Sequence, residues 1–595
     1  MKNTYHTLVI GSGCAGYNAA DWLFDLGVTD IALITEGQKM GTSRNTGSDK
    51  QTYYKLTIAG EESDSVYEMA RTLFDGGAVH GDTALAEAAG SVKAFMKLVH
   101  FGLPFPTNKY GAYIGYKTDH DPRQRATSCG PLTSKLMTEA LEKSVLQKGI
   151  EIIDNAPVAK LLVEDNQIQG LVYYRVGEGF VTLRAQNIIL ATGGPAGVYA
   201  DSVFPISQTG GTGLALAAGA DACNLQEWQY GLASTDFRWN VSGTYQQVLP
   251  RYISVDADGI EHEFLAEYFS NPAEGLNRVF LKGYQWPFDT RKLEGSSLID
   301  LLVAAEMKEK KRTVYMDFRR NPSRLNFEDL NDEVYDYLKK SDALFGTPIE
   351  RLQKMNPKAI DLYRNNGIDL HTEPLKVAVC AQHCNGGIAV DINWETNIKG
   401  LYAVGEAAGT FGVYRPGGSA LNSAQVGSMR AAEHIARKGE TLGESEENAA
   451  DFTPPVFNYA PTVNFIKKTR ATQDAMSHYA AYNRDIPQMQ KLYDNCRRQV
   501  ERFFDDATIT CDADIPALYK AYDLLITQEK VLSAMLFAAR EWGTHGGAMV
   551  KGTQETDAAR LKEVVITKGN YSTFAPVRAL PECDDWFERD WEAQR

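Results

Sequence analysis

The sequence is poor in cysteine, with eight thiols scattered over 595 residues and no Cys-x-x-Cys pair. Structural zinc sites and ferredoxin-type clusters need closely spaced cysteines, so neither is expected. Cys380 and Cys384 flank His383, but their spacing on an expected strand or loop is poor ligand geometry, and we predict no metal site. Scattered, unpaired cysteines are typical of a reducing compartment. We therefore expect a cytoplasmic protein without an iron–sulfur cluster of its own.

Long apolar runs and an excess of positive charge are also absent. No stretch reaches the roughly 18 apolar residues of a membrane-spanning helix, and residues 1–5 lead into the first apolar segment without a signal-peptide core. We expect no membrane insertion. Acidic residues outnumber basic ones, 76 to 61, which argues against nucleic acid or an anionic membrane as a partner. The 44% hydrophobic content suits a globular chain of about three domains.

A glycine-rich segment at the N-terminus, VIGSGCAG at residues 9–16, indicates a strand, a tight turn and the start of a helix. Gly11 permits the turn, Gly13 lets the backbone approach a pyrophosphate, and Gly16 lets the helix pack on the strand. The next apolar strand ends at Glu36, where a ribose-binding carboxylate is expected. The segment predicts a dinucleotide site. The alternative is a glycine-rich turn without a ligand.

A second segment, GLYAVGEAA at residues 400–408, is an apolar strand that runs into Gly405 and Glu406. Together with the N-terminal segment it favours FAD over NAD. A third apolar strand, at residues 187–190, ends in Ala191-Thr192-Gly193-Gly194. If one FAD is to be enclosed, the first strand and the strands near 188 and 402 must be neighbours. The ligand then lies at a topological switch point.

We therefore predict an α/β fold with a discontinuous, Rossmann-like FAD-binding domain, an inserted α+β capping domain and a C-terminal helical domain. Residues 133–148 have the pattern of an amphipathic helix. Residues 441–457 are acidic and contain proline, which is typical of a linker. The predicted boundaries are 1–234 and 371–440 for the two parts of the FAD-binding domain, 235–370 for the capping and substrate domain, and 456–595 for the helical domain and tail.

With these motifs, the chain resembles the fumarate reductase/succinate dehydrogenase flavoprotein family, which also includes L-aspartate oxidase and the α subunit of adenylylsulfate reductase. The resemblance runs in family order through nearly the whole chain and is weakest between residues 230 and 370. It implies FAD, a capping domain over the isoalloxazine and a C-terminal helical domain. Its matching stretches are VIGSGCAGYNAA, IILATGG, TGGTGLALAAGA, CAQHCNGGIAVD, ETNIKGLYAVGEAAG, RPGGSAL and REWGTHGG.

The mode of cofactor attachment departs from that of many relatives. In covalent members, a histidine in the polar stretch after the second strand is attached to the flavin. Residues 43–46 are Ser-Arg-Asn-Thr here, without histidine, so we predict noncovalent FAD. The residues expected at the cofactor are Gly11, Gly13, Cys14, Ala15, Gly16, Glu36, Ser43, Arg44, Thr46, Gly47, Ser48, Val158, Ala191, Thr192, Gly193, Gly213, Glu406, Ser419, Ala420 and Leu421.

Two residues are candidates for substrate binding through the resemblance. His383 aligns with the family's substrate-contacting histidine and can donate a hydrogen bond to a carboxylate or carbonyl. Arg415 aligns with the substrate-binding arginine, whose fork suits a bidentate anion. A core histidine and a surface arginine are the alternatives. The loop before Arg415 is shorter than is usual in the family, so we expect Tyr414 to fill space at the pocket wall.

Two further departures bear on the substrate. Family members commonly carry His-Pro-Thr-Gly where residues 227–232 read EWQYGL, and the proton-donating arginine is expected near Ser296-Ser297, with Arg291 the nearest basic candidate. Reducing a dicarboxylate alkene needs a positioned acid, so we predict that neither fumarate nor succinate is the substrate. Trp228 and Tyr230 could form a flatter, more aromatic pocket, or they could belong to the core.

We interpret the chain as an FAD-dependent oxidoreductase that moves hydride or electrons between flavin and a small, anionic or carbonyl-bearing organic substrate. A separate iron–sulfur or ferredoxin-like protein is the expected electron partner, and an oligomer is compatible with the sequence. Two alternatives stay open. One is an adenylylsulfate-reductase-like flavoprotein that works with an iron–sulfur partner. The other is a non-catalytic electron-transfer flavoprotein.

Overall fold

The computed structural model describes residues 2–59, 63–195, 197–439, 452–557 and 561–582. Most of the predicted linker, residues 441–457, therefore lies outside the described residues. Within them, no helix combines the length and apolarity needed to cross a membrane.

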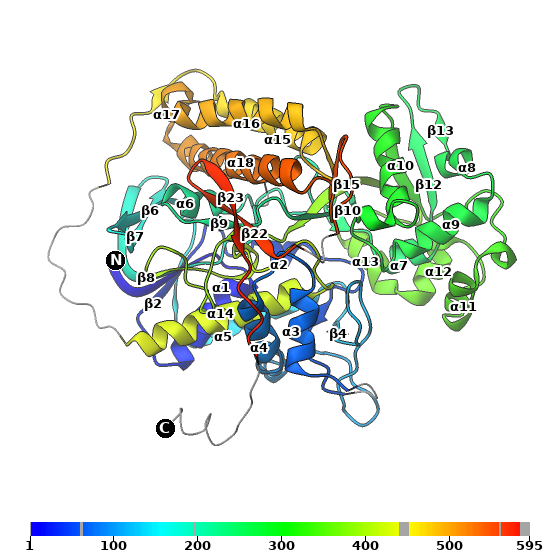
Figure 1. The fold of residues 1–595 in the computed structure, drawn as a ribbon, viewed down its shortest axis with the longest axis horizontal. Helices are drawn as coiled ribbons and strands as arrows, with labels where there is room; N and C mark the ends of the chain where they lie inside the picture. The colour runs from blue at the N-terminus through cyan, green and yellow to red at the C-terminus, as the bar shows by residue number, and fades with distance from the viewer. Residues whose placement is uncertain (1, 60–62, 196, 440–451, 558–560, 583–595) are drawn as a thin grey trace.

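A seven-stranded sheet forms the centre of the first domain (Figure 1). Strand β8 is parallel to both β1 and β17, with Ile189 opposite Val9 on one side and Tyr402 on the other. The predicted neighbourhood of the three strands is therefore confirmed. The sheet runs β5 (Glu151–Ile153), β2 (Ile31–Ile34), β1 (Thr4–Ile10), β8 (Gly179–Leu190), β7 (Gln167–Arg175) and β6 (Val158–Glu164), with β17 (Leu401–Ala403) also on β8.

Helices cover this sheet because its parallel strands β1, β2, β8 and β17 end in buried, apolar residues that need covering on both faces. Helix α1 (Cys14–Asp25) follows β1 directly and packs against α14 (Ser419–Lys438) and α5 (Thr133–Gln147). Helix α5 confirms the amphipathic helix predicted for residues 133–148. Helix α14 also packs on α4 (Gly81–His100), which pairs with α3 (Val66–Phe74). The glycine turn thus lies between the central sheet and α14.

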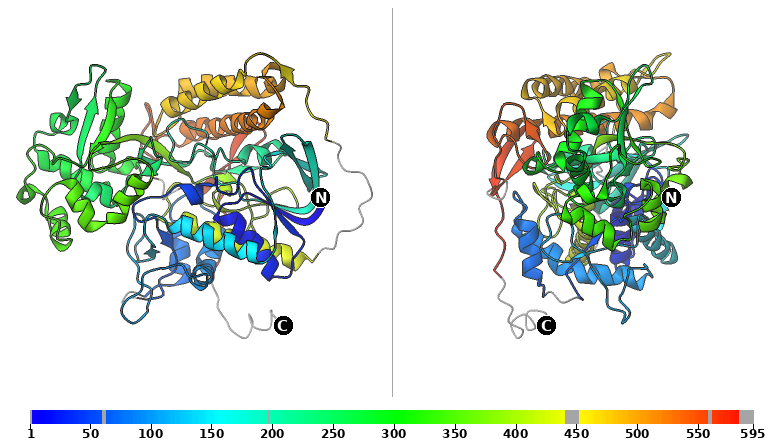
Figure 2. Two further views of the ribbon diagram at one scale, coloured as in Figure 1. Left: turned by 180° about the vertical axis from the view of Figure 1, so that it is seen from behind. Right: turned by 90° about the vertical axis from the view of Figure 1, so that its right-hand side faces the viewer.

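A second, six-stranded sheet carries the chain into a separate lobe (Figure 2). Its antiparallel pair β10 (Trp228–Ser234) and β15 (Leu375–Cys384) connects the lobe to the first domain. The rest of the lobe comprises β11 (Trp239–Asn240), β12 (Arg251–Val255), β13 (Glu261–His262), β14 (Thr313–Asp317), α7 (Thr244–Gln247), α8 (Phe264–Tyr268), α9 (Pro272–Leu281), α10 (Ser297–Lys308), α11 (Asp332–Lys340), α12 (Pro348–Met355) and α13 (Pro357–Asn365). We call this lobe the cap.

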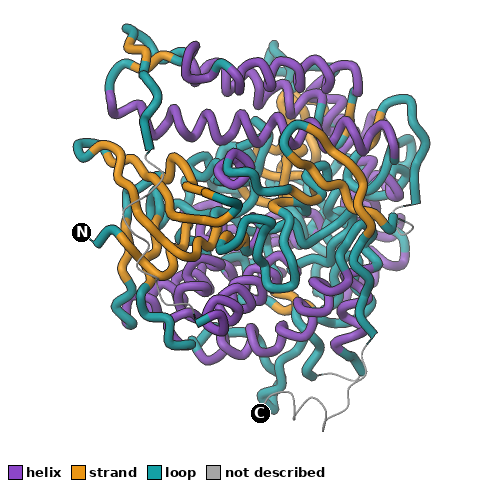
Figure 3. The backbone as a smooth tube through the Cα atoms, turned by 60° about the vertical axis from the view of Figure 1, so that its left-hand side comes forward, coloured by secondary structure: helices purple, strands orange, loops and turns teal. Residues whose placement is uncertain are grey.

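The C-terminal helices lie along one side of the molecule (Figure 3). They are α15 (Phe465–Tyr479), α16 (Ile486–Glu501), α17 (Phe503–Asp506) and α18 (Ile515–Glu541). After them the chain returns to the first domain, because the hairpin of β22 (Glu563–Lys568) and β23 (Tyr571–Pro576) pairs with β9 (Ala222–Cys223), which also pairs with β16 (Gly387–Ile388). This return has no counterpart among the sequence predictions.

Short elements complete the described fold. They are β3 (Tyr53–Tyr54) with β4 (Ala126–Thr127), β18 (Asn458–Tyr459) with β20 (Thr508–Ile509), β19 (Asn483–Arg484) with β21 (Met549–Val550), helices α2 (Thr42–Asn45) and α6 (Thr212–Ala217), and the 3-10 turns η1 (Thr290–Lys292), η2 (Phe327–Asp329), η3 (Gly405–Ala407) and η4 (Asp512–Asp514).

Candidate active site

A cavity of about 1010 Å³ lies between the central sheet and the cap. Its floor is formed where β1, β2 and β8 end, since Ile10, Thr35 and Ala191 all line it. Cap residues, including Trp286, line the opposite side. Ligands of open α/β sheets bind beyond the carboxyl ends of the strands, and the cavity has this position.

The glycine turn at the cavity floor leaves no room for side chains. Gly11 has φ of +113°, and a Cβ there would lie 2.4 Å from the Ala191 carbonyl oxygen. A Cβ on Gly16 would lie 1.9 Å from the Gly11 carbonyl oxygen. Gly13 precedes α1 and lines the cavity. The helix therefore begins with its positive dipole end at the cavity, which favours a bound anion such as a pyrophosphate.

The far end of this floor carries polar groups suited to a nucleotide. Glu36, directly after β2, lines the cavity and forms an ion pair with Lys520 of α18, which also lines it. Thr192 lines the cavity as well, and its buried hydroxyl has no hydrogen-bond partner among the described residues. A bare glycine turn, a carboxylate one strand away and an unpartnered hydroxyl fit a dinucleotide.

Most residues predicted at the cofactor line this cavity. They are Gly11, Gly13, Cys14, Ala15, Glu36, Ser43, Thr46, Gly47, Ser48, Val158, Ala191, Thr192, Gly193, Glu406, Ala420 and Leu421.

Four of the predicted cofactor residues lie behind the lining instead. Gly16 packs on Gly11, and Gly213 packs on the Asp523 carbonyl oxygen, where a Cβ would approach to 2.2 Å. Arg44 donates to Glu142 of α5 at 2.7 Å. Ser419 begins α14, and its hydroxyl donates to the Pro416 carbonyl. These residues shape the floor and do not face the cavity.

Arg415 enters the cavity from the loop before α14. One terminal nitrogen donates to Gln229 Oε1, the other lies 3.4 Å from Ser419 Oγ, and its Nε has no partner in the described part of the chain. Burial lowers the pKa of the guanidinium to about 10, opposed by the Glu406 and Glu87 carboxyls. Arg415 therefore remains a cation at neutral pH, with donor capacity left for a ligand.

His383, at the end of β15, is buried beside Arg415 and lines the same cavity. Its Nδ1 lies 3.0 Å from Asn385 Oδ1. Its Nε2 lies 3.9 Å from Glu406 Oε1 and has no hydrogen-bond partner among the residues described. Burial, reinforced by the Arg415 charge, holds the pKa of the imidazole well below its usual range. The ring is therefore neutral at pH 7.

Glu406 follows β17 and closes this end of the floor. Its Oε1 accepts the Cys384 backbone N–H at 3.0 Å. Burial raises the pKa of the carboxyl to about 7, although the Cys384 N–H and the Arg415 charge both oppose the shift. Near neutral pH this carboxyl can therefore hold or release a proton beside the cavity.

A β-bulge directs two consecutive side chains into the cavity. In the pairing of β10 with β15, Gln229 faces His383 and Tyr230 faces Ala381, which leaves Gln382 as the extra residue. Bulges re-aim side chains in this way. As a result both Gln382 and His383 line the cavity. The sequence predictions missed Gln382 because a bulge depends on the partner strand.

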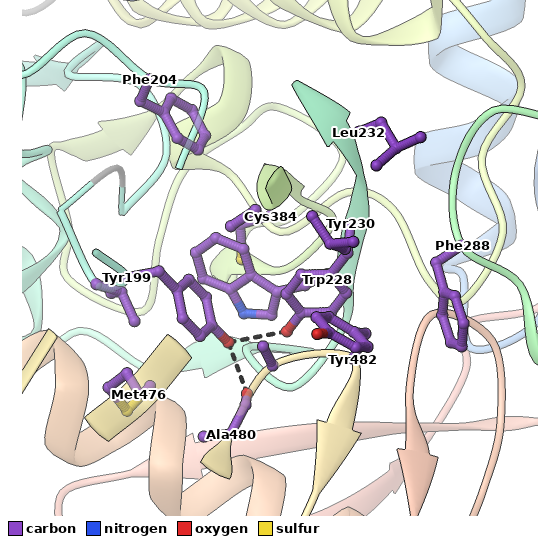
Figure 4. Close-up of a cluster of buried hydrophobic side chains, with 14 of the residues drawn as sticks. Tyr199, Phe204, Trp228, Tyr230, Leu232, Phe288, Cys384, Met476, Ala480 and Tyr482 are labelled. Atoms are coloured by element: carbon purple, nitrogen blue, oxygen red, sulfur yellow. Dashed lines mark hydrogen bonds between the residues drawn. The ribbon is translucent and has the colours of Figure 1, made fainter. Parts of the chain in front are cut away.

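Trp228 and Tyr230 do not line the cavity, which corrects the aromatic pocket considered from the sequence. Both belong to the buried core (Figure 4). Trp228 Nε1 donates to the Leu225 carbonyl at 2.9 Å, and the Tyr230 hydroxyl lies 2.8 Å from that of Tyr199. Alternation along β10 turns Gln229 to the cavity and its neighbours to the core. The two-residue repeat of a strand is the sequence signal that could have identified Gln229 as a cavity residue.

The cap supplies an aromatic wall in a different way. The ring of Trp286 lines the cavity and covers Gly231, since a Cβ on Gly231 would lie 3.1 Å from both Cε2 and Cζ2 of the indole. Gly231 lies in the segment where family members commonly carry a histidine. The indole leaves no space for a side chain at Gly231. No local sequence pattern links these two residues, so this contact was missed.

Tyr414 and Arg291 pack on each other outside the cavity lining. The Arg291 guanidinium lies 3.6 Å from the centre of the Tyr414 ring and pairs with Asp289 at 2.8 Å. Tyr414 also packs against His120, which does line the cavity. Ser297 accepts the Asp289 N–H. Arg291 and Ser297, at and near the position expected for the proton donor, therefore belong to a cluster beside the cavity and do not face it.

Most of the chain matches a known protein family. Residues 6–421 match the FAD binding domain family. The chain belongs to this family. It is 27% identical over 445 residues to a fumarate reductase (CoM/CoB) subunit of Methanothermobacter marburgensis, covering 71% of each chain. It is 25% identical to L-aspartate oxidase of Streptomyces coelicolor, covering 72% of this chain and 68% of that one.

Solved flavoproteins share the fold. Escherichia coli quinol fumarate reductase matches with a TM-score of 0.71 at 20% identity, covering 98% of this chain and 99% of that one. Adenylylsulfate reductase of Archaeoglobus fulgidus matches at 0.64 and 17% identity, covering 98% and 97%. The resemblance stated from the sequence is thereby confirmed, as are the fold class and FAD as cofactor. This FAD-binding chain is an FAD-dependent oxidoreductase.

Proposed function

We propose that this oxidoreductase holds FAD noncovalently on the glycine floor and binds a small organic substrate between Arg415 and His383. The observation that carries the proposal is that both side chains line the same cavity as the glycine turn, and each has a buried polar atom without a protein partner in the described chain. FAD supplies the electron-transfer chemistry when bound. We assign the pyrophosphate to the start of α1 and the ribose to Glu36.

The substrate contacts follow from the charges on the cavity wall. A guanidinium fork binds a carboxylate or a carbonyl oxygen, and Gln229 holds the Arg415 fork in one orientation. The Trp286 indole, lying over Gly231, adds an apolar face to the cavity lining. We therefore propose a substrate with one anionic or carbonyl group on Arg415 and an uncharged face against the indole.

Fumarate and succinate do not suit this wall. A dicarboxylate needs groups for its second carboxylate, and alkene reduction needs a positioned acid. Residues 227–232 contain no histidine, and Arg291 is engaged with Asp289 outside the cavity. We propose that both dicarboxylates are poor substrates.

We further propose a cytoplasmic enzyme that exchanges electrons with a separate iron–sulfur or ferredoxin-like protein. The chain has no closely spaced cysteines for a cluster of its own. The relative from Methanothermobacter marburgensis is named as one subunit of its enzyme, which supports a partner for this chain.

An anaerobic reoxidation screen tests the function. The flavin is photoreduced, and small carboxylates and carbonyl compounds are tested for reoxidation, with fumarate as the comparator. We expect reoxidation by an anionic or carbonyl compound, loss of that reaction in Arg415→Ala, and retention in Arg437→Ala, an exposed arginine on α14. Fumarate-dependent reoxidation at a typical enzymatic rate of about 10 per second would contradict the proposed specificity.

A further inference from the structure

The bulged end of β15 has unpartnered hydrogen-bond acceptors, and not donors, buried beside the substrate part of the cavity. Gln382 and His383 are both more than nine-tenths buried and both line the cavity. Each has one polar atom bonded to the protein and one without a partner in the described chain. Which atom is left over determines what kind of ligand group can bind.

Gln382 uses its donor within the protein. Its Nε2 donates to the Gly231 carbonyl at 2.8 Å, which fixes the orientation of the side-chain amide. The atom left without a partner among the described residues is Oε1, a pure acceptor.

His383 uses its donor in the same way, through Asn385. The Asn385 amide nitrogen donates to the Gly412 carbonyl at 2.8 Å, so its oxygen is the atom that faces His383. That oxygen can only accept, and therefore Nδ1 of His383 carries the hydrogen. In a neutral ring, the buried and unpartnered Nε2 then carries a lone pair beside the cavity. This reverses the donor role that the sequence suggested for His383.

We propose that the substrate is a hydroxylated organic acid, whose carboxylate binds Arg415 and whose neighbouring hydroxyl donates to His383 Nε2, with Gln382 Oε1 accepting a further ligand hydrogen. This inference rests on the proposed function, because it uses the same anion site at Arg415. A hydroxyl suits the position better than an ammonium group, since the buried Arg415 cation would repel a second positive charge. A carbonyl oxygen there would leave both acceptors unpaired.

Equilibrium binding to the FAD-loaded protein tests the inference without turnover. The probes are 2-hydroxy-2-methylpropanoate and 2,2-dimethylpropanoate, which have the same shape and differ by a hydroxyl in place of a methyl group. Neither has a hydrogen on carbon 2, so neither can be dehydrogenated there. Calorimetry or the change in flavin absorbance gives both dissociation constants. We expect the hydroxy acid to bind at least about tenfold more tightly, because the methyl group leaves the buried His383 acceptor unpaired.

Variants assign that preference to its atoms. In His383→Phe and Asn385→Leu we expect the preference to fall within about threefold, because the acceptor is lost in the first and its tautomer is no longer fixed in the second. His434→Phe on α14, a half-buried histidine outside the cavity, is the matched control and should keep the full preference. Gln382→Leu should keep its FAD and the full preference, because the single hydroxyl hydrogen of the probe goes to His383.

Each contrary result has a distinct meaning. Equal affinities for the two acids in the wild type, or an undiminished preference in His383→Phe, would overturn the inference while leaving the anion site intact. Tighter binding of 2-amino-2-methylpropanoate would overturn the hydroxyl assignment. If the wild type binds neither acid, or if Arg415→Ala binds both as well as the wild type does, the anion site of the proposed function is wrong and the inference fails with it.

Discussion

Lys520 of α18 forms an ion pair with Glu36 at the end of β2, so the C-terminal helical domain reaches the nucleotide end of the cavity. The pair joins two segments that are far apart in the sequence. It also holds the carboxylate that is proposed to bind the ribose.

Replacing Glu36 with alanine should weaken FAD binding. Loss of a charged hydrogen bond costs about 1.5–3 kcal/mol, or roughly a tenfold to hundredfold rise in the FAD dissociation constant. Flavin fluorescence during titration of the apoprotein measures it. Glu178→Ala, at an exposed position, should leave the dissociation constant unchanged. An unchanged constant in Glu36→Ala would place this carboxylate away from the cofactor.

Acid precipitation should release intact FAD into the supernatant. Residues 43–46 contain no histidine, and Ser43, which lines the cavity, accepts the Cys14 N–H. Chromatography of the supernatant against authentic FAD measures the released fraction. Yellow colour or fluorescence that stays with the precipitated protein would show a covalent bond instead.

Tyr230→Phe should affect stability and leave turnover per flavin unchanged. The substitution removes the hydroxyl that lies 2.8 Å from the Tyr199 hydroxyl in the core (Figure 4). Losing one buried hydrogen bond costs about 1 kcal/mol of unfolding free energy, which denaturant titration of the holoprotein would detect. A large fall in turnover without a loss of stability would return Tyr230 to the active site.

Arg415→Lys should impair turnover strongly while FAD content and the visible spectrum stay normal. Lysine keeps the charge but loses the planar fork that Gln229 orients, so the substrate is misplaced even when it binds. Steady-state kinetics with a substrate found in the reoxidation screen provide the measurement. Arg437→Lys on the same helix is the control. Loss of FAD with normal turnover per remaining flavin would make Arg415 a structural residue.

Glu87 should make stability depend on pH. Burial raises the pKa of its carboxyl from 4.5 to about 7, although the Ser423 hydroxyl donates to it. The native state therefore holds this proton more tightly than the unfolded chain does. The resulting stabilisation is complete below about pH 4.5 and is lost as the pH rises to about 7, by up to about 3 kcal/mol.

Denaturant titrations across that pH range would measure the effect as the difference between the wild type and Glu87→Gln. The amide does not titrate, so the variant should lose less stability as the pH rises. Glu433→Gln, on the partly exposed side of α14 where Lys93 pairs with Glu433, should follow the wild type. Parallel curves for the wild type and Glu87→Gln would contradict the raised pKa.

Sequence patterns within short segments predicted the elements whose structure depends on neighbouring residues. The spacing of Gly11, Gly13 and Gly16 anticipated the turn, and apolar periodicity anticipated α5. The neighbourhood of β1, β8 and β17 followed from requiring one cofactor to be enclosed. Each of these depends on residues close in sequence or on a single ligand.

The substrate end depends on contacts between distant segments. The bulge at Gln382 exists only in the pairing with β10, and Trp286 reaches Gly231 from within the cap. At such positions the surrounding fold decides where a side chain lies. Trp228 and Tyr230 belong to the core, although their aromatic character suggested a pocket, and Gln229 between them lines the cavity. The alternation of side chains along β10 indicates that Gln229 and its two neighbours point to opposite sides of the sheet. Which of these sides faces the cavity depends on the position of the cap.

The antiparallel pair β10 and β15 that connects the cap to the central sheet has a mechanical consequence. Gln229 and His383 lie opposite each other at the end of this pair nearest the floor, whereas Trp286 belongs to the cap. Trp286 is nevertheless held on β10, since its indole covers Gly231 and its Nε1 donates to the Leu232 carbonyl at 3.3 Å, while the Phe288 N–H donates to the Tyr230 carbonyl at 2.7 Å. The aromatic wall and the polar pair are therefore attached to the same strand, and a displacement of β10 would move them together.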